Sequence, residues 1–235
     1  MPVYQLPDEP LFPSPDEAEP GGLLAVGGDL SLIRLLRAYA MGIFPWYSDE
    51  DPILWWSPDP RLILEPSKLK VSKSLRRVVK KGQFSVTFDR VFDRVIGKCA
   101  TARRRGGEGT WIVDDMIRAY TELHRAGFAH SVESWDGTEL AGGLYGVSIG
   151  KAFFGESMFT QAKDASKVAL VYLADMLAAW QFDFIDCQIT TDHLLRMGAH
   201  EIPRTAFLQR LARAVTHRTR RGRWTLPEDH EPLCE

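Results

Sequence analysis

The chain has 235 residues, of which 45% are hydrophobic and 26% charged, and its net charge is −2 at neutral pH. This composition is ordinary for a soluble globular protein of one large or two modest domains. The net charge favours neither a nucleic acid nor an acidic surface as a partner. No apolar run approaches the length of a membrane span, and the N-terminus lacks the pattern of a signal peptide. The three cysteines have no metal-type spacing. We therefore expect a cytoplasmic protein without a bound metal or cofactor.

The first thirty residues are rich in proline, glycine and acids, which predicts an irregular arm that lies over another part of the protein. Ser31 is then a suitable N-cap for a helix that ends near Gly42. The apolar residues of this helix recur on one face: Leu32, Leu35, Leu36 and Tyr39.

Three tryptophans and four prolines fall within residues 42–61. Such density predicts a rigid surface with aromatic walls, rather than a helix or a sheet. Trp46, Trp55 and Trp56 could fill the core of a small domain, or they could offer indole rings on which a nucleobase stacks.

Residues 67–82 carry seven basic side chains and no acid. Ser72 and Gly82 are suitable first and last residues for a short helix with a continuous cationic face. We expect this face to bind an RNA phosphate backbone. The residues predicted to do so are Lys73, Arg76, Arg77, Lys80 and Lys81. Two further basic clusters follow, at residues 103–105 and 218–223.

From residue 83 onward the expected order is a strand, two helices, three antiparallel strands, a helix, a parallel strand and further helices. The predicted ranges are a strand at 84–88, helices at 89–99 and 114–127, a strand ending at Trp135, a hairpin at 139–159, a helix capped by Asp164, a strand at 182–189, and helices around 194–197 and from Thr205.

The hairpin, Glu139–Phe159, is the segment around which we expect the site to form. Apolar and small residues alternate with period two on both sides of Gly150, and four glycines leave room for a ligand or another backbone. Glu156 lies among apolar neighbours, where a carboxylate requires an ion-pair partner or a function. A purely structural ion pair is equally compatible with the spacing.

This order of elements resembles the GCN5-related N-acetyltransferase fold, an α+β class with a mixed sheet, preceded here by a small N-terminal α/β domain. A coenzyme A enzyme of that fold would carry a glycine-rich pyrophosphate loop between the fourth strand and the third helix. The corresponding segment, Gly155–Ser166, has no glycine after its first residue. The donor is therefore expected to be something other than acyl-CoA.

A set of motifs from Gly21 to Arg204 resembles the bacterial leucyl/phenylalanyl-tRNA–protein transferases. These motifs are GGLLAVGGDLS, GIFPWYS, DPILWWSPDPR, GTWI, AHSVE, GGLYGV, FFGESMF, FIDCQ and MGAHEIPR. The resemblance implies transfer of Leu, Phe and some Met from aminoacyl-tRNA to proteins with an N-terminal Arg or Lys, which marks them for degradation. It also implies two domains, at residues 1–62 and 63–235.

Carried over by position, the resemblance implies that Trp46 and Trp111 stack on the terminal adenine. The implied aminoacyl side-chain pocket is formed by Leu144, Phe153, Glu156, Leu173 and Leu177. The best-known members have Met at the first of these positions and Phe at the last two, so we expect a wider pocket here. The implied catalytic pair is Asp186 and Gln188.

Asp186 and Gln188 are two residues apart on a predicted strand and so would project from one face. The implied reaction is aminolysis of an activated ester. Our hypothesis is that Gln188 orients the amine and accepts or relays its proton, while Asp186 polarises Gln188. A substrate-assisted route through the ribose hydroxyl is equally compatible. Glu156 is expected either to pair with the acceptor's cationic first side chain or to anchor the donor's α-ammonium.

Two alternatives remain open on the sequence. One is an N-acyltransferase of the same fold that uses acyl-CoA, and the other is a non-catalytic RNA-binding module. We expect a monomer whose partners are aminoacyl-tRNA and protein N-termini.

Overall fold

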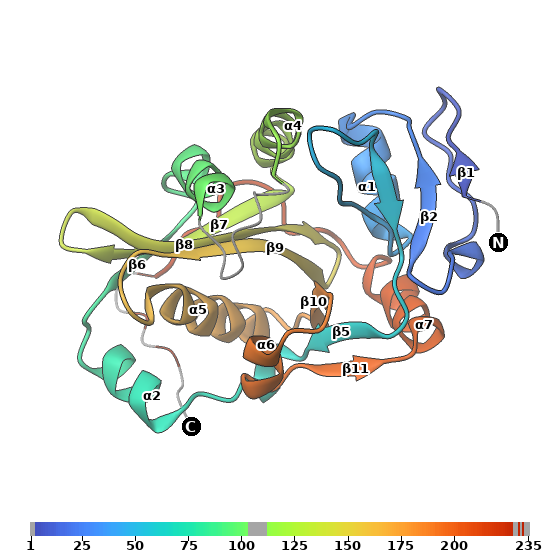
Figure 1. The fold of residues 1–235 in the computed structure, drawn as a ribbon. Helices are drawn as coiled ribbons and strands as arrows, with labels where there is room; N and C mark the ends of the chain where they lie inside the picture. The colour runs from blue at the N-terminus through green and yellow to red at the C-terminus, as the bar shows by residue number, and fades with distance from the viewer. Residues whose placement is uncertain (1–2, 103–111, 228–229, 231, 233–235) are drawn as a thin grey trace.

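The computed structural model describes residues 3–102, 112–227, 230 and 232 and contains two sheets that lie side by side (Figure 1). The smaller sheet has the strand order β1-β2-β4-β3. Its strands are Tyr4–Gln5 (β1), Leu23–Val26 (β2), Phe44–Pro45 (β3) and Leu54–Trp56 (β4). Strand β1 runs parallel to β2, and the remaining pairs are antiparallel.

Helix α1, Leu32–Ala40, packs beside the smaller sheet and confirms the predicted cap. The Ser31 hydroxyl accepts a hydrogen bond from the backbone N–H of Arg34 at 3.4 Å. Gly42 follows the helix with φ +76°, a conformation that glycine adopts without strain.

The prediction of an irregular aromatic segment at residues 42–61 is wrong in part, because β3 and β4 lie within it. Trp55 is fully buried and its indole N–H donates to the carbonyl of Gly27 at 2.9 Å. Burial of this ring fixes β4 against β2, so the short strands depend on tertiary packing rather than on local pattern. The N-terminal arm, predicted to be irregular, likewise supplies β1 and β2.

The larger sheet is mixed and has the strand order β11-β5-β10-β9-β8-β7-β6. Its strands are Arg61–Leu64 (β5), Ser85–Phe88 (β6), Ala129–Asp136 (β7), Glu139–Ile149 (β8), Ala152–Thr160 (β9), Phe184–Gln188 (β10) and His200–Ile202 (β11). Strand β10 runs parallel to β9, as predicted, while β5 and β11 extend the sheet beyond the predicted strands.

Helices cover both faces of the larger sheet, with α3 and α4 on one side and α5 on the other (Figure 1). The helices are Lys73–Lys80 (α2), Phe92–Thr101 (α3), Asp114–Arg125 (α4), Ala165–Ala179 (α5), Asp192–Arg196 (α6) and Arg204–Ala214 (α7), with single 3₁₀ turns at Pro15–Glu17 and Pro66–Lys68. Each predicted helix is therefore present, and two apolar cores form, one on each face of the sheet.

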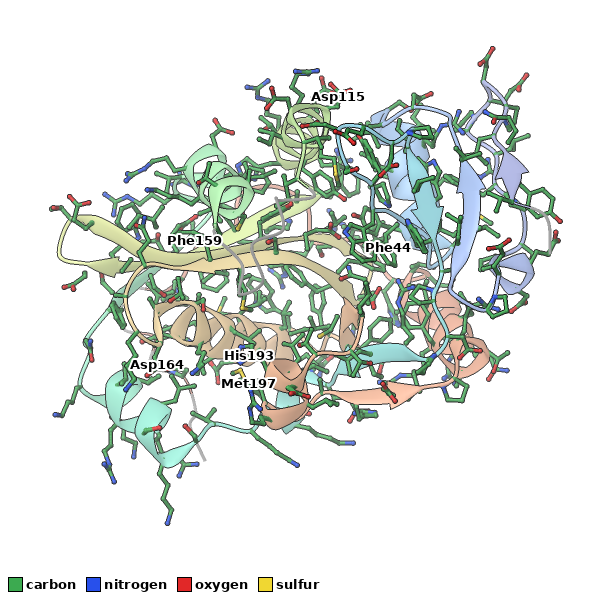
Figure 2. All side chains as sticks on the ribbon, in the orientation of Figure 1. Phe44, Asp115, Phe159, Asp164, His193 and Met197 are labelled. Atoms are coloured by element: carbon green, nitrogen blue, oxygen red, sulfur yellow. The ribbon has the colours of Figure 1, made fainter. Side chains whose placement is uncertain are left out.

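Asp164 precedes α5 as predicted, but its side chain does not cap the helix. The residue is left-handed, with φ +67°, and its carboxylate instead pairs with the Lys167 amine at 2.7 Å. Asp164 is labelled in Figure 2, where it lies at the end of α5 next to the hairpin.

Two irregularities of the sheet shape its centre. Tyr145 of β8 pairs with Ser157 and the next residue, Gly146, pairs with Gly155, so Glu156 bulges out of the ladder. A Cβ atom on Gly146 would overlap the Phe154 carbonyl oxygen, so this register requires glycine. Strand β9 pairs with β10 only over residues 152–154, and the two strands part beyond that point.

A buried ion pair joins two neighbouring strands of the larger sheet, β5 and β10. The Arg61 Nε and Nη2 atoms donate to the two carboxylate oxygens of Asp186 at 2.8 and 2.7 Å. The third nitrogen, Nη1, donates to the Gly42 carbonyl at 3.1 Å. The guanidinium lies 4.9 Å from the ring centre of Phe44 and 4.5 Å from that of Phe207. Phe44, labelled in Figure 2, lies where the smaller sheet meets the larger one.

We predict that Arg61→Met lowers the free energy of unfolding by about 3–5 kcal/mol, because it leaves the Asp186 carboxylate buried without its partner. Urea denaturation measures the loss. Arg118→Ala, which removes an exposed ion pair with Asp115, is the control and should cost less than about 1 kcal/mol. A loss at Arg61 no larger than that of the control would contradict the prediction.

Candidate active site

The Glu156 carboxylate lies where four elements meet. The Tyr39 hydroxyl from α1 donates to Oε1 at 2.7 Å, and the Tyr120 hydroxyl from α4 donates to Oε2 at 3.0 Å. The two tyrosine hydroxyls also contact each other. The side-chain amide of Gln188, from β10, donates to Oε1 at 3.4 Å. The bulge in β9 directs Glu156 towards this cluster.

Burial raises the pKa of Glu156 from its ordinary value of 4.5 to about 7. The hydrogen bonds from Tyr39 and Tyr120 and the charge of Arg61 lower the pKa, whereas the nearby Asp186 charge raises it. Burial also raises the pKa of both tyrosines well above 10, so they remain protonated donors. Glu156 can therefore gain or lose a proton near neutral pH.

Asp186 is fully buried and acts on the backbone of Gln188. Its Oδ1 atom accepts from the Gln188 backbone N–H at 3.0 Å, while Arg61 occupies both carboxylate oxygens. Gln188 has φ +55°, and the β10–β5 register shifts between the two residues. This irregularity turns the Gln188 amide towards Glu156.

The structure thus brings Glu156, Asp186 and Gln188 together, as the sequence predicted, and adds three groups that sequence reasoning missed. Tyr39 was placed on the apolar face of its helix, and Tyr120 and Arg61 were given no role. No local signal identifies them, because their partners lie 36 to 125 residues away in the chain.

The four apolar residues predicted to line the donor pocket are all buried in the core between the sheet and α5: Leu144, Phe153, Leu173 and Leu177. Tyr39 and Tyr120 belong to the core on the other face. Cys187 and Met158 adjoin the site residues and pack against the first of these cores.

Trp46 keeps 37% of its surface exposed, and its ring centre lies 5.7 Å from that of Trp56. The Trp56 indole N–H donates to the Trp46 carbonyl at 2.7 Å, which holds the exposed ring in place. Trp111 lies outside the described residues, so the predicted stacking pair stays a prediction.

Helix α2 turns Leu75 and Val79 inward. Among its predicted RNA contacts, Arg76 is half-buried and the others are exposed: Lys73, Arg77, Lys80 and Lys81. Figure 2 shows nitrogen-tipped side chains that project from α2 into solvent.

Within the described part of the chain, no group of three or more His, Cys, Asp or Glu side chains is placed to hold a metal ion. Nor is any helix of that part long and apolar enough to cross a membrane.

A carboxylate that titrates near neutrality beside a positioned amide is suited to an enzyme that removes a proton from a nucleophile. Comparison with protein families shows to which family of enzymes the chain belongs. Residues 63–212 match the leucyl/phenylalanyl-tRNA protein transferase model, and residues 28–59 match the model of that family's N-terminal domain. The chain belongs to the leucyl/phenylalanyl-tRNA protein transferase family.

Curated relatives of that name support the assignment. One from Anaeromyxobacter sp. (strain Fw109-5) is 60% identical over 232 residues, which cover 99% of each chain. One from Solidesulfovibrio magneticus is 60% identical over 227 residues, or 97% of this chain and 92% of the relative. A functionally unknown protein of Staphylococcus epidermidis has a TM-score of 0.41 at 9% identity, over 77% of this chain and 68% of that one, and this likeness is too slight for an argument.

We predict that Glu156→Gln gains stability relative to the parent protein as pH rises. Below pH 4.5 the carboxyl group is protonated in both folded and unfolded chains. Between pH 4.5 and about 7 only the unfolded chain ionises, so the parent loses stability across that window, whereas the variant does not. The difference in melting temperature should therefore be larger at pH 8 than at pH 5. The exposed Glu122, changed to Gln, is the control, and an unchanged difference at Glu156 would contradict the prediction.

Proposed function

We propose that this protein transfers Leu, Phe and some Met from aminoacyl-tRNA to the α-amino group of proteins that begin with Arg or Lys, and so marks them for degradation. The observation that carries the proposal is the cluster of Glu156, Tyr39, Tyr120 and Gln188, in a chain of this family. We place the reaction in the cytoplasm and expect a monomer.

The chemistry is aminolysis of an ester. The acceptor amine attacks the aminoacyl carbonyl carbon, a peptide bond forms, and the bond to the ribose oxygen of the tRNA breaks. A free α-amine has a pKa of about 8, so part of it is already neutral at pH 7. Alignment of amine and carbonyl can therefore supply most of the rate, an effect worth roughly 7–11 kcal/mol.

Gln188 orients the acceptor amine and Glu156 accepts its proton. The Gln188 amide N–H points at Glu156, which leaves its carbonyl oxygen to accept a hydrogen bond from the acceptor amine. Glu156 then takes the proton that the amine loses, a transfer that is nearly balanced because its pKa is about 7. The departing ribose oxygen regains a proton from Glu156 or through the neighbouring ribose hydroxyl.

Asp186 is a positioning residue in this scheme. It is fully buried, so it reaches the substrate only through Gln188, whose backbone N–H it accepts. Arg61 holds Asp186 in turn, and the pair sets the direction of the Gln188 side chain.

The donor would bind beside the Glu156 cluster. The exposed Trp46, together with Trp111, would stack on the terminal adenine, and the aminoacyl side chain would enter the core at Leu144, Phe153, Leu173 and Leu177. The basic face of α2 would bind RNA phosphates. We keep the division into a small domain at 1–62 and an acyltransferase-like domain at 63–235 as part of this proposal.

Transfer of labelled Leu from Leu-tRNA to an Arg-starting peptide tests the function. An Ala-starting peptide is the control and should accept little label. Addition of Phe-tRNA and Met-tRNA in competition measures the donor preference. A non-catalytic RNA-binding module would give no product, and an acyl-CoA enzyme would gain thermal stability from coenzyme A rather than from an aminoacyl-adenosine analogue.

We predict that Gln188→Ala lowers the single-turnover rate at least tenfold at saturating substrates, because the amine loses its orienting group. Asp186→Asn should lower the rate less, provided that urea denaturation finds it folded, since an amide oxygen can still accept from the Gln188 N–H. Rates within about threefold of the parent for both variants would remove these residues from the mechanism.

We predict that Glu156→Gln slows transfer and changes its pH dependence. In the parent the rate should rise through about pH 7 as Glu156 ionises, whereas in the variant the rise should follow the amine alone, near pH 8. Peptides that start with Arg, Lys and Ala separate the other roles of Glu156. A loss confined to Arg and Lys would show that it binds the acceptor side chain, and a uniform loss with an unshifted profile would show that it anchors the donor.

A further inference from the structure

The segment after α7 is strongly basic and has no part in the site described above. Together with α7 it forms a stretch, residues 202–227, that contains seven arginines and no Asp or Glu. Four of the arginines lie in the six residues 218–223, and all four are exposed: Arg218, Arg220, Arg221 and Arg223.

This segment is fixed on the surface at several points. The Thr219 hydroxyl accepts from the Gly150 N–H at 2.9 Å, and the Gly222 N–H donates to the Gly127 carbonyl at 3.3 Å. The Trp224 backbone N–H donates to the buried Asp89 carboxylate at 2.7 Å. The Trp224 ring stacks on His130, with 3.7 Å between ring centres. The backbone that carries the arginines is therefore held in place before any partner binds, which reduces the entropy lost on binding.

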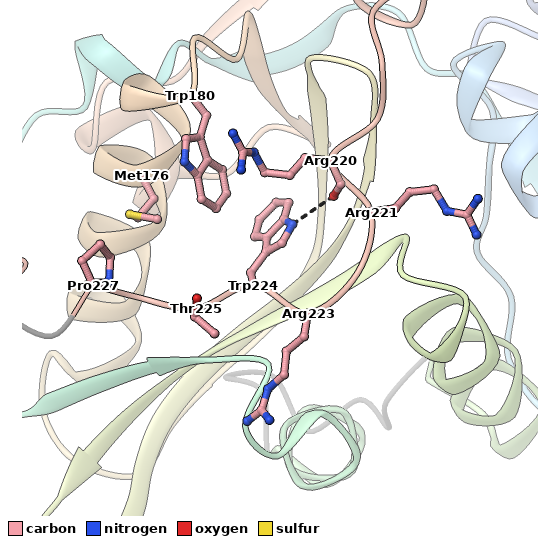
Figure 3. A pocket seen from close by; sticks show the side chains of 8 residues that line it. All are labelled: Met176, Trp180, Arg220, Arg221, Arg223, Trp224, Thr225 and Pro227. Atoms are coloured by element: carbon pink, nitrogen blue, oxygen red, sulfur yellow. Dashed lines mark hydrogen bonds between the residues drawn. The ribbon is translucent and has the colours of Figure 1, made fainter.

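The segment borders a hollow of about 270 Å³ against the end of α5 (Figure 3). The half-buried Trp180 forms one wall, and the Arg220 guanidinium lies 4.3 Å from its ring centre. The Trp224 indole N–H donates to the Arg220 carbonyl at 3.0 Å, as Figure 3 shows. Arg221 is held by the Ala126 carbonyl and lies over Phe128. In Figure 3 the Arg223 side chain extends away from the two tryptophans.

The positive charge here is not neutralised by the described residues. None of the four arginines forms an ion pair with a carboxylate in the part of the chain that the structure describes. Three acids of the described residues have other partners: Asp89 binds His130, Asp175 binds His230, and Asp183 binds Arg210. An arginine against an indole ring, with three further exposed arginines on the same six residues, is suited to phosphate groups and a stacked base.

We propose that Arg218, Arg220, Arg221 and Arg223, with Trp180, form a second RNA-binding surface that contacts the phosphate backbone of the aminoacyl-tRNA outside its aminoacylated end. The inference rests on the proposed function, because that function supplies the RNA. Guanidinium forks bind phosphates bidentately and stack on aromatic rings, whereas an acidic peptide offers carboxylates without a ring to stack. RNA is therefore the partner that uses both parts of this surface.

The test measures binding of Leu-tRNA at several salt concentrations. The double variant Arg220→Gln with Arg223→Gln should lower the magnitude of the slope of log affinity against log salt by about two and weaken binding at least tenfold near 0.1 M salt. Arg94→Gln is the matched control, since Arg94 is also exposed and lies over an indole ring, that of Trp135. Arg220→Lys with Arg223→Lys should restore the slope, because it restores the charge.

Transfer from a short aminoacyl-CCA donor separates this inference from the function on which it rests. The double variant should transfer from that donor as fast as the parent, because the short donor does not reach residues 218–223. An unchanged salt slope with normal transfer would overturn the RNA surface alone, whereas no transfer by the parent protein would overturn the function. Binding of AMP or ATP that displaces no tRNA, with this nucleotide affinity lost in the double variant, would show a nucleotide pocket and also overturn the proposal.

Discussion

The pairing of Arg61 with Asp186 is the interaction on which the rest of the structure depends. It connects strand β5 to the neighbouring strand β10, and it places the Gly42 carbonyl, Phe44 and Phe207 around one guanidinium. A buried ion pair adds little net stability over an apolar pair of similar volume. We infer that the ion pair serves to position other groups. The Asp186 Oδ1 atom that Arg61 holds also accepts a hydrogen bond from the backbone N–H of Gln188.

The surroundings of Glu156 keep its carboxyl group close to neutral pH in its titration. Glu156 is carried on a bulge and surrounded by donors from three other elements, yet burial keeps its pKa near 7. A fully ionised glutamate would hold an amine's proton too weakly, and a permanently neutral one could not accept it. The tyrosine hydroxyls and the buried acid nearby set the balance between these limits.

Much of this architecture could be predicted from the sequence, and the exceptions have physical reasons. Helices α1 and α2 are predictable from their N-caps, Ser31 and Ser72, and from a periodic apolar face. The long hairpin is predictable from the period-two alternation of its residues. The two-residue strands around Trp55 have no such period, because they are stabilised by distant packing. The resemblance singled out Asp186 and Gln188, but Gln188 leaves regular strand geometry at φ +55°, which a strand pattern does not predict. The roles of Tyr39 and Arg61 depend on partners more than a hundred residues away.

Helix α1 belongs to the smaller unit, yet its Tyr39 hydroxyl completes the surroundings of a carboxylate on the larger sheet. Neither unit alone therefore contains the whole cluster around Glu156. A chimera that joins the first sixty residues of one relative to the remainder of another would retain function only if the residues of the two parents were compatible at the contact between Tyr39 and Glu156. Substitutions on the α1 side and on the β9 side of this contact are thus expected to be inherited together.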